Sequence, residues 1–89
     1  MDLVHNQDAC RFECSLDGAL AVCEYRVDGG VWDFFHTHVP GSMRGKGVAN
    51  ILVEAALKYV LSINGKIRPT CSYVAAYIAR HPEYRKDIV

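Results

Sequence analysis

Alternation of apolar and polar residues marks three strands in the first half of the chain. Residues 9–16, 19–27 and 31–39 each repeat with a period of two, and in the first of these Phe12 and Cys14 share one face. A period of two over this length is typical of β-strands that are buried on one side. We therefore expect three consecutive half-buried strands.

Short glycine-containing turns separate these strands. Asp17-Gly18 joins the first strand to the second, and Asp28-Gly29-Gly30 joins the second to the third. A two-residue type I′ turn needs positive φ at both central positions, which Asp-Gly tolerates, so the pattern predicts an antiparallel meander. Four side chains of the third strand are expected on one face, namely Trp32, Phe34, His36 and His38.

The apolar period changes to that of a helix over residues 48–63. Glu54 and Lys58 are spaced to pair across one turn, and Asn64-Gly65 predicts a left-handed helix end. We expect one apolar stripe along this helix, formed by Val48, Ile51, Leu52, Ala55, Tyr59 and Ile63.

A short strand and a second helix complete the pattern. Residues 66–70 read as a strand whose Pro69 predicts an edge position. Ser72 is a favourable N-cap for a helix over 73–80, which Pro82 prevents from continuing. The fold class is therefore α+β, an α/β sandwich in which a meander precedes a strand–loop–helix–strand–helix unit.

Length and composition refine this fold. The chain has 89 residues, 51% of them hydrophobic, which predicts a single domain over 1–89 with a small core. A bound ligand or weak homo-oligomerisation is expected to add stability. Ten basic and ten acidic residues give a net charge of zero, which argues against a general nucleic-acid binder.

Cysteine usage and hydropathy indicate the compartment. The four cysteines form no CxxC pair, and no signal peptide or apolar run of membrane-spanning length is present. We expect a cytoplasmic protein with free thiols, no membrane partner and no metal site. Cys10, Cys14 and Cys23 are interpreted as residues that pack within strands.

The loop between the third strand and the main helix carries the clearest chemistry. Glycines and cations at a strand–helix junction present backbone N–H groups and a helix N-terminus to a phosphate. The P-loop and the Rossmann fingerprint both need glycine spacings that are absent here. What remains is Arg44-x-x-Gly47-x-Ala49, with a further cation at Lys46.

This spacing resembles the acetyl-CoA pyrophosphate loop, [QR]-x-x-G-x-[GA], of the GNAT acetyltransferases. Residues 36–40 (HTHVP), 69–74 (PTCSYV) and 81–84 (HPEY) extend the resemblance to the small, stand-alone GNAT-like acetyltransferases. It covers the chain from Phe12 to Tyr84 and implies a minimal GNAT fold. In that fold the strands over 31–39 and 67–70 run parallel and splay apart around pantetheine.

The resemblance also implies which residues bind acetyl-CoA or CoA. Backbone groups near Thr37, His38 and Val39 would bind pantetheine, and Cys71 and Tyr77 would line the slot. The pyrophosphate would be held by amides of Arg44, Gly45, Lys46, Gly47, Val48 and Ala49.

Four residues are candidates for catalysis. Cys71 precedes the second helix, where the helix dipole favours a thiolate, and the resemblance puts it near the thioester as a nucleophile or a contact. His36 or His38 could take the proton of an ammonium acceptor, and Tyr73 could protonate the departing CoA thiolate. For each of them, packing in the core or against the cofactor is the alternative interpretation.

The function implied is an acetyl-CoA-dependent N-acetyltransferase that acts on an amine of a small molecule or protein. The amine attacks the thioester directly, or the acetyl group passes through Cys71. His38 stands where an acidic residue is common in the small family, which argues against a carboxylate base on this strand. The chain is too short for the helical pair that builds the acceptor pocket in longer members. The alternative is therefore a CoA-binding interaction module without efficient catalysis.

Overall fold

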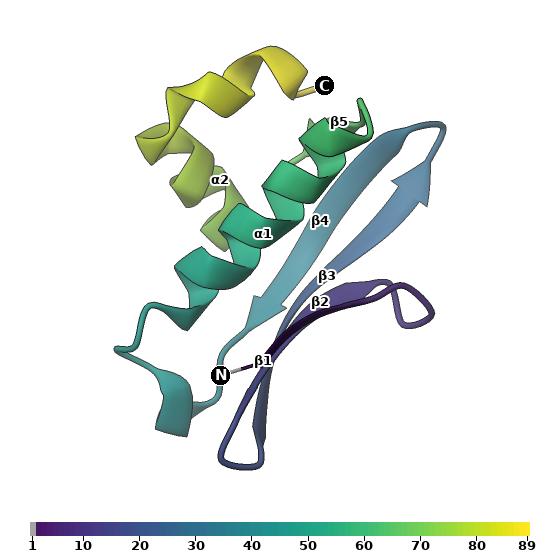
Figure 1. Ribbon diagram of the computed structural model, residues 1–89. Helices are drawn as coiled ribbons and strands as arrows, with labels where there is room; N and C mark the ends of the chain where they lie inside the picture. Colours follow the sequence, from purple (N-terminus) through teal and green to yellow (C-terminus); the bar gives the residue numbers. More distant parts are fainter. Residues whose placement is uncertain (1) are drawn as a thin grey trace.

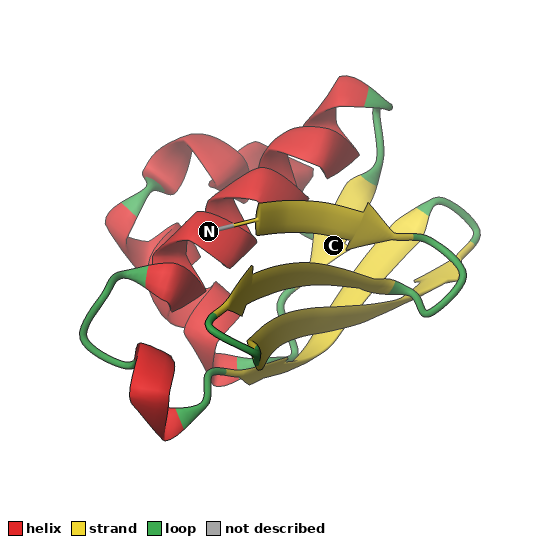
Figure 2. Cartoon of the chain, turned by 60° about the horizontal axis from the view of Figure 1, so that its bottom comes forward, coloured by secondary structure: helices red, strands yellow, loops and turns green. Residues whose placement is uncertain are grey.

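A five-stranded mixed sheet forms one layer of the protein, and its helices form the other (Figures 1 and 2). The computed structural model describes residues 2–89. The strands are β1 (Asp2–Asn6), β2 (Arg11–Leu16), β3 (Ala19–Asp28), β4 (Val31–His38) and β5 (Lys66–Arg68), in that spatial order. The helices are α1 (Val48–Ser62) and α2 (Ser72–Arg80), with 3₁₀ turns η1 (Gly41–Met43) and η2 (Pro82–Asp87). This arrangement confirms the predicted α+β class.

The predicted meander is present in β2, β3 and β4. Asp17 and Gly18 both have positive φ, at 50° and 79°, and join the paired residues Leu16 and Ala19. Gly29 and Gly30 make the second tight turn, with φ of 57° and 80°. The turn chemistry read from the sequence therefore fixes both antiparallel hairpins.

The first strand, β1, is absent from the sequence-based prediction. It pairs antiparallel with β2, but Leu3 and Val4 are both exposed, so no alternation marks it. His5 faces its partner Phe12, and the two rings stack with centroids 4.0 Å apart. The prediction for Cys10 is wrong, because this residue lies exposed in the β1–β2 turn with φ of 54°. Cys14 and Cys23 are fully buried, as expected.

A β-bulge in β4 overturns the predicted face of that strand. Tyr25 pairs with Phe34, whereas Glu24 pairs with His36, so Phe35 is an extra residue. An inserted residue exchanges the two faces of a strand beyond it. Trp32 and Phe34 point into the core as expected, but His36 and His38 point to the opposite face.

Helix α1 ends as the sequence predicts. Asn64 has φ of 58°, its N–H bonds to Leu61 O, and the N–H of Gly65 bonds to Val60 O. These two bonds form a Schellman motif, which satisfies the last carbonyls of the helix. Glu54 and Lys58 pair at 3.2 Å, also as expected.

The buried face of α1 differs from the predicted stripe. Ile51 and Ile63 are exposed, while Val53 and Leu57 are buried. Apolar residues surround much of this helix, so periodicity alone does not specify the face that the sheet covers. The buried side chains of α1 are Val48, Leu52, Val53, Ala56, Leu57 and Val60.

The parallel pair β4–β5 is short and leads directly to α2. Val31, Trp32 and Asp33 pair with Lys66, Ile67 and Arg68, and the ladder ends before Pro69. Helix α2 begins one residue earlier than predicted, because Cys71 and not Ser72 is its N-cap. Helix α2 lies beside α1, through a bond from Tyr77 to Glu54 and another from Arg80 to Asn50.

Neither helix of residues 2–89 has the length and apolar character that spanning a membrane requires.

Candidate functional site

The loop that leads into α1 uses two glycines in conformations that other residues adopt rarely. Gly45 and Gly47 have φ of 79° and 72°, and Gly47 is the N-cap of α1. A side chain at a positive φ crowds the following carbonyl, so glycine is the residue that fits here. The glycines thus turn the chain sharply from η1 into the helix.

The N-terminus of α1 offers unpaired backbone donors. The Gly47 cap supplies no side-chain hydrogen bond, and the first helical bond runs from Ile51 N to Gly47 O at 3.1 Å. The amides of Val48, Ala49 and Asn50 therefore have no partner within the helix. Their dipoles add to the positive end of the helix, which favours a bound anion.

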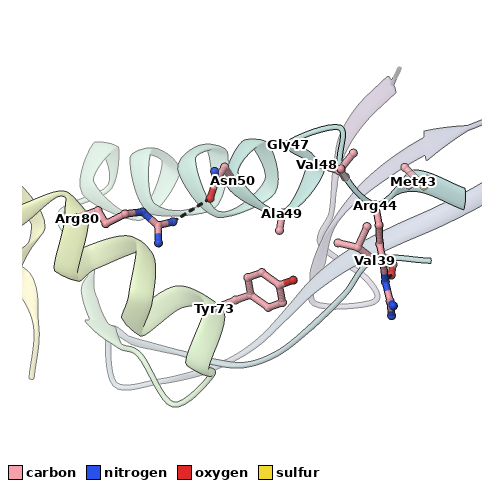
Figure 3. A pocket seen from close by; sticks show the side chains of 10 residues that line it. Val39, Met43, Arg44, Gly47, Val48, Ala49, Asn50, Tyr73 and Arg80 are labelled. Carbon is pink, nitrogen blue, oxygen red and sulfur yellow. Dashed lines mark hydrogen bonds between the residues drawn. The ribbon is translucent and has the colours of Figure 1, made fainter. Parts of the chain in front are cut away.

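A cavity of about 390 Å³ opens at this helix end (Figure 3). It lies between the α1 N-terminus, the end of β4 and helix α2. Ten residues line it: Val39, Met43, Arg44, Gly45, Gly47, Val48, Ala49, Asn50, Tyr73 and Arg80. Two arginines and no carboxylate are among them, so its charge suits an anionic ligand.

The two arginines occupy different ends of the cavity. The Nε of Arg44 donates to the carbonyl of Val39 at 3.2 Å, which ties the loop to the end of β4. Arg80 donates to Oδ1 of Asn50 at 3.2 Å from the other side (Figure 3). Lys46 belongs to the same loop but does not line the cavity.

Beyond the bulge, the outer edge of β4 has no strand partner. Thr70 Oγ1 donates to Asp33 at 2.5 Å, and the amide of Cys71 donates to Phe34 O at 2.8 Å. After that bond the chain turns away into α2, while β4 continues to His38 paired only with β3. The parallel strands therefore separate, and an unpaired edge of this kind can accept an extended ligand.

Cys71 lies at this separation. Its side chain is buried, and Sγ donates to Oγ1 of Thr37 at 3.4 Å. Thr37 faces the core, since it pairs with the buried Cys23. Burial raises the pKa of Cys23 to about 11, although the Thr37 hydroxyl acts in the opposite direction. The hydroxyl of Thr37 is thus the polar contact of two buried thiols. Of these, Cys71 is the one that lies at the unpaired edge of β4.

His36 and His38 lie away from the cavity. They pair with Glu24 and Val22 on the face of the sheet opposite the helices, and both are exposed. Their rings stack in parallel, with centroids 6.5 Å apart. Their side chains do not line the cavity at α1 and are exposed on the open face of the sheet.

The two tyrosines of α2 occupy different environments. Tyr73 is exposed and lines the cavity, where Figure 3 shows its hydroxyl pointing toward the β4 side. Tyr77 is buried, stacked on His81 with centroids 4.0 Å apart, and does not line the cavity. Burial, together with Tyr84 and Glu54, raises the pKa of Tyr77 to about 12.

The cavity thus gathers only part of the predicted site. Val39, Arg44, Gly45, Gly47, Val48, Ala49 and Tyr73 line it, whereas His36, Thr37, His38, Lys46, Cys71 and Tyr77 do not. Met43, Asn50 and Arg80 line it without having been predicted. Arg80 follows Tyr73 by seven residues, two helical turns, and this spacing on α2 could have indicated a shared face. Within residues 2–89, no cluster of three or more His, Cys, Asp or Glu side chains could hold a metal ion.

Comparisons with known proteins agree with one another. The sequence profile of a family described as GCN5-related N-acetyl-transferase matches residues 11–88. Protein NATD1 of Mus musculus is 34% identical over 82 residues, which span 88% of this chain and 74% of that protein. Protein NATD1 of Danio rerio is 32% identical over an alignment of 90 residues, which covers 99% of this chain and 81% of that protein.

A solved structure shows the same similarity in three dimensions. The NMR solution structure of a GCN5-like protein from Staphylococcus aureus matches with a TM-score of 0.76 at 25% identity. The match covers 99% of this chain and 87% of that chain. It therefore includes both the sheet and the helices that enclose the cavity.

Proposed function

Because this chain belongs to the family of GCN5-related N-acetyltransferases, we propose that it transfers an acetyl group from acetyl-CoA to an amine. The observation that carries the proposal is the cationic cavity at the N-terminus of α1. Its glycine loop, its unpaired amides and Arg44 suit a diphosphate, and no carboxylate lines the cavity to oppose one. The acceptor is an amine of a small molecule or protein.

The rest of the cofactor fits the edge of β4. Amides at the start of α1 hold the pyrophosphate in this proposal, and pantetheine extends along the unpaired edge near Thr37, His38 and Val39. Extended ligands bind such an edge through backbone hydrogen bonds. The thioester then lies where β4 and β5 separate, close to Cys71 and Thr37.

Direct transfer needs few groups. The amine nitrogen attacks the thioester carbonyl carbon, the carbon–sulfur bond breaks, and CoA leaves as a thiolate that Tyr73 protonates. Backbone N–H groups at the separation of the strands stabilise the oxyanion. His36, His38 or water takes the proton lost by the amine. Since both histidines lie on the open face, the amine approaches from that face in this proposal.

A covalent route through Cys71 is the second version of the mechanism. The Cys71 sulfur attacks the acetyl carbonyl as its thiol loses a proton, and CoA leaves with that proton as a thiol. The amine then attacks the acetyl-cysteine, and the proton that the amine loses returns to the Cys71 sulfur. The burial of Cys71 beside Thr37 supports a position near the thioester. Intact-mass measurement after mixing with acetyl-CoA distinguishes the two routes. An adduct of one acetyl group on wild type and none on Cys71→Ala supports the covalent route, and full activity of Cys71→Ala excludes it.

Calorimetry with CoA and acetyl-CoA tests the proposal as a whole. We expect binding at sub-millimolar concentration, weakened in Arg44→Ala and abolished in Gly47→Glu. Gly41→Glu is the matched control, because it adds the same charge in η1 at a residue that does not line the cavity. Absence of binding by the wild type refutes the proposal. If the protein binds CoA but transfers no acetyl group to any of a panel of amines, the result supports a CoA-binding interaction module instead. Within residues 2–89 one face of the sheet carries no helix, which favours this alternative.

A further inference from the structure

We propose that Arg80 binds the 3′-phosphate of CoA, so that the protein prefers CoA to 3′-dephospho-CoA. The inference rests on the proposed function, since it takes CoA as the ligand of the cavity. It adds a residue of α2 to a phosphate site otherwise built by the loop and α1.

Arg80 has the position that a second phosphate contact requires. It lines the cavity, and its guanidinium reaches the third residue of α1 through the bond to Asn50. Asn50 lies three residues beyond the Gly47 cap, slightly less than one helical turn, because an α-helix has roughly 3.6 residues per turn. The guanidinium of Arg80 therefore lies next to the α1 amides that bind the pyrophosphate in the proposal, but at a separate position.

Arg80 is also free to bind an anion. Across residues 2–89 the ion pairs join Arg11 with Glu13, Lys58 with Glu54 and Lys66 with Asp87, and none includes Arg80. Its one side-chain bond is to a neutral amide oxygen, so its remaining N–H groups can still donate. Arginine is well suited to phosphate because its planar group can donate two parallel hydrogen bonds.

The direction of α2 decides which phosphate Arg80 meets. Its N-cap, Cys71, lies beside the proposed thioester position, and its last residue is Arg80. Nine residues separate these two, a span of roughly 13 Å along the axis. In CoA, the 3′-phosphate is on the ribose, at the far side of the pyrophosphate from the thiol. Arg80 lies at the corresponding far end of the site.

Calorimetry with CoA and 3′-dephospho-CoA tests the inference. We expect wild type to bind CoA about tenfold more tightly, the scale of one charge-assisted hydrogen bond. Arg80→Gln should lose this preference while its affinity for 3′-dephospho-CoA stays within about twofold, and Arg80→Lys should keep part of it. Arg85→Gln is the matched control: it also removes one exposed positive charge, but from η2 and outside the cavity, and should keep the full preference.

Each other outcome overturns the inference. Equal affinity of the wild type for both nucleotides would mean that the 3′-phosphate has no partner in the protein. If Arg80→Gln lowers the affinity for both nucleotides by the same factor, Arg80 contacts the pyrophosphate and not the 3′-phosphate. If wild type binds neither nucleotide, the proposed function fails as well, whereas the first two results leave it intact.

Discussion

The thiol of Cys71 donates a hydrogen bond to the hydroxyl of Thr37, with 3.4 Å between Sγ and Oγ1. This bond joins the N-terminus of α2 to β4 two residues beyond the bulge at Phe35. Without the bulge, the alternation of the strand would turn Thr37 away from the core and a histidine toward it. The extra residue in β4 therefore decides which side chain meets Cys71.

Replacement of Thr37 tests the value of this contact. Thr37→Val keeps the shape of the side chain but removes the polar partner of two buried thiols, and we expect a loss of about 1 kcal/mol in the free energy of unfolding. Thr37→Ser keeps the hydroxyl and should lose less than Thr37→Val. Urea denaturation measures both. Equal stability of the Val variant and wild type would mean that the bond contributes nothing.

The loop glycine Gly47 is the subject of the second prediction. Gly47→Ala adds no clash, because nothing lies within 4 Å of its Cβ, but the residue must stay at φ of 72°. We expect a loss of about 1 kcal/mol from that conformation alone. Gly47→Asn should lose less, because asparagine tolerates the left-handed region better. Thermal and urea unfolding measure the stability of wild type and both variants. An Ala variant as stable as the Asn variant would contradict this explanation.

The sequence predicts those elements whose signal is local. Turn residues such as Asp17-Gly18 and the helix end at Asn64-Gly65 act through their own backbone preferences, so their positions are correct. The glycine loop at Gly45 and Gly47 is recognisable for the same reason. Strand β1 has no such signal, since Leu3 and Val4 are both exposed and pairing with β2 alone defines it.

The parts of the site that the sequence does not predict depend on distant contacts. A bulge arises from the register of β3 against β4, so no local pattern announces that His36 and His38 face away from the core. Arg80 joins the cavity because α2 packs beside α1, and Tyr77 leaves it because it packs against His81 and Glu54. Such placements require the assembled tertiary structure.

The third prediction concerns Gly65, which follows α1. An added Cβ would lie 2.7 Å from Val60 Cγ1 and 3.1 Å from the indole of Trp32, so Gly65→Ala forces the core to shift. Overpacking of this kind is expected to cost about 1–3 kcal/mol. Gly41→Ala is the matched control, because nothing lies within 4 Å of its Cβ and its φ is not positive. If both variants lose the same stability by urea denaturation, the clash is not the cause.

The last prediction follows from the buried phenol of Tyr77. In the folded protein its pKa is raised to about 12, first by burial and then by Tyr84 and Glu54, whereas an unfolded tyrosine titrates near 10. Between these two values the unfolded chain releases the proton and the folded protein keeps it. The folded state then binds more protons, so its stability must fall as pH rises from 10 toward 12.

Tyr77→Phe isolates this effect, because phenylalanine has no proton to release. At pH 7 to 9 the variant should differ from wild type by a constant amount, which reports the loss of the buried hydroxyl and its contacts with Glu54 and Tyr84. Above pH 10 the free energy of unfolding of wild type should fall relative to the variant, so the difference between them changes in favour of Tyr77→Phe. Urea denaturation at a series of pH values measures this difference. If the difference stays constant up to pH 11.5, the pKa of Tyr77 is no higher in the folded protein than in the unfolded chain.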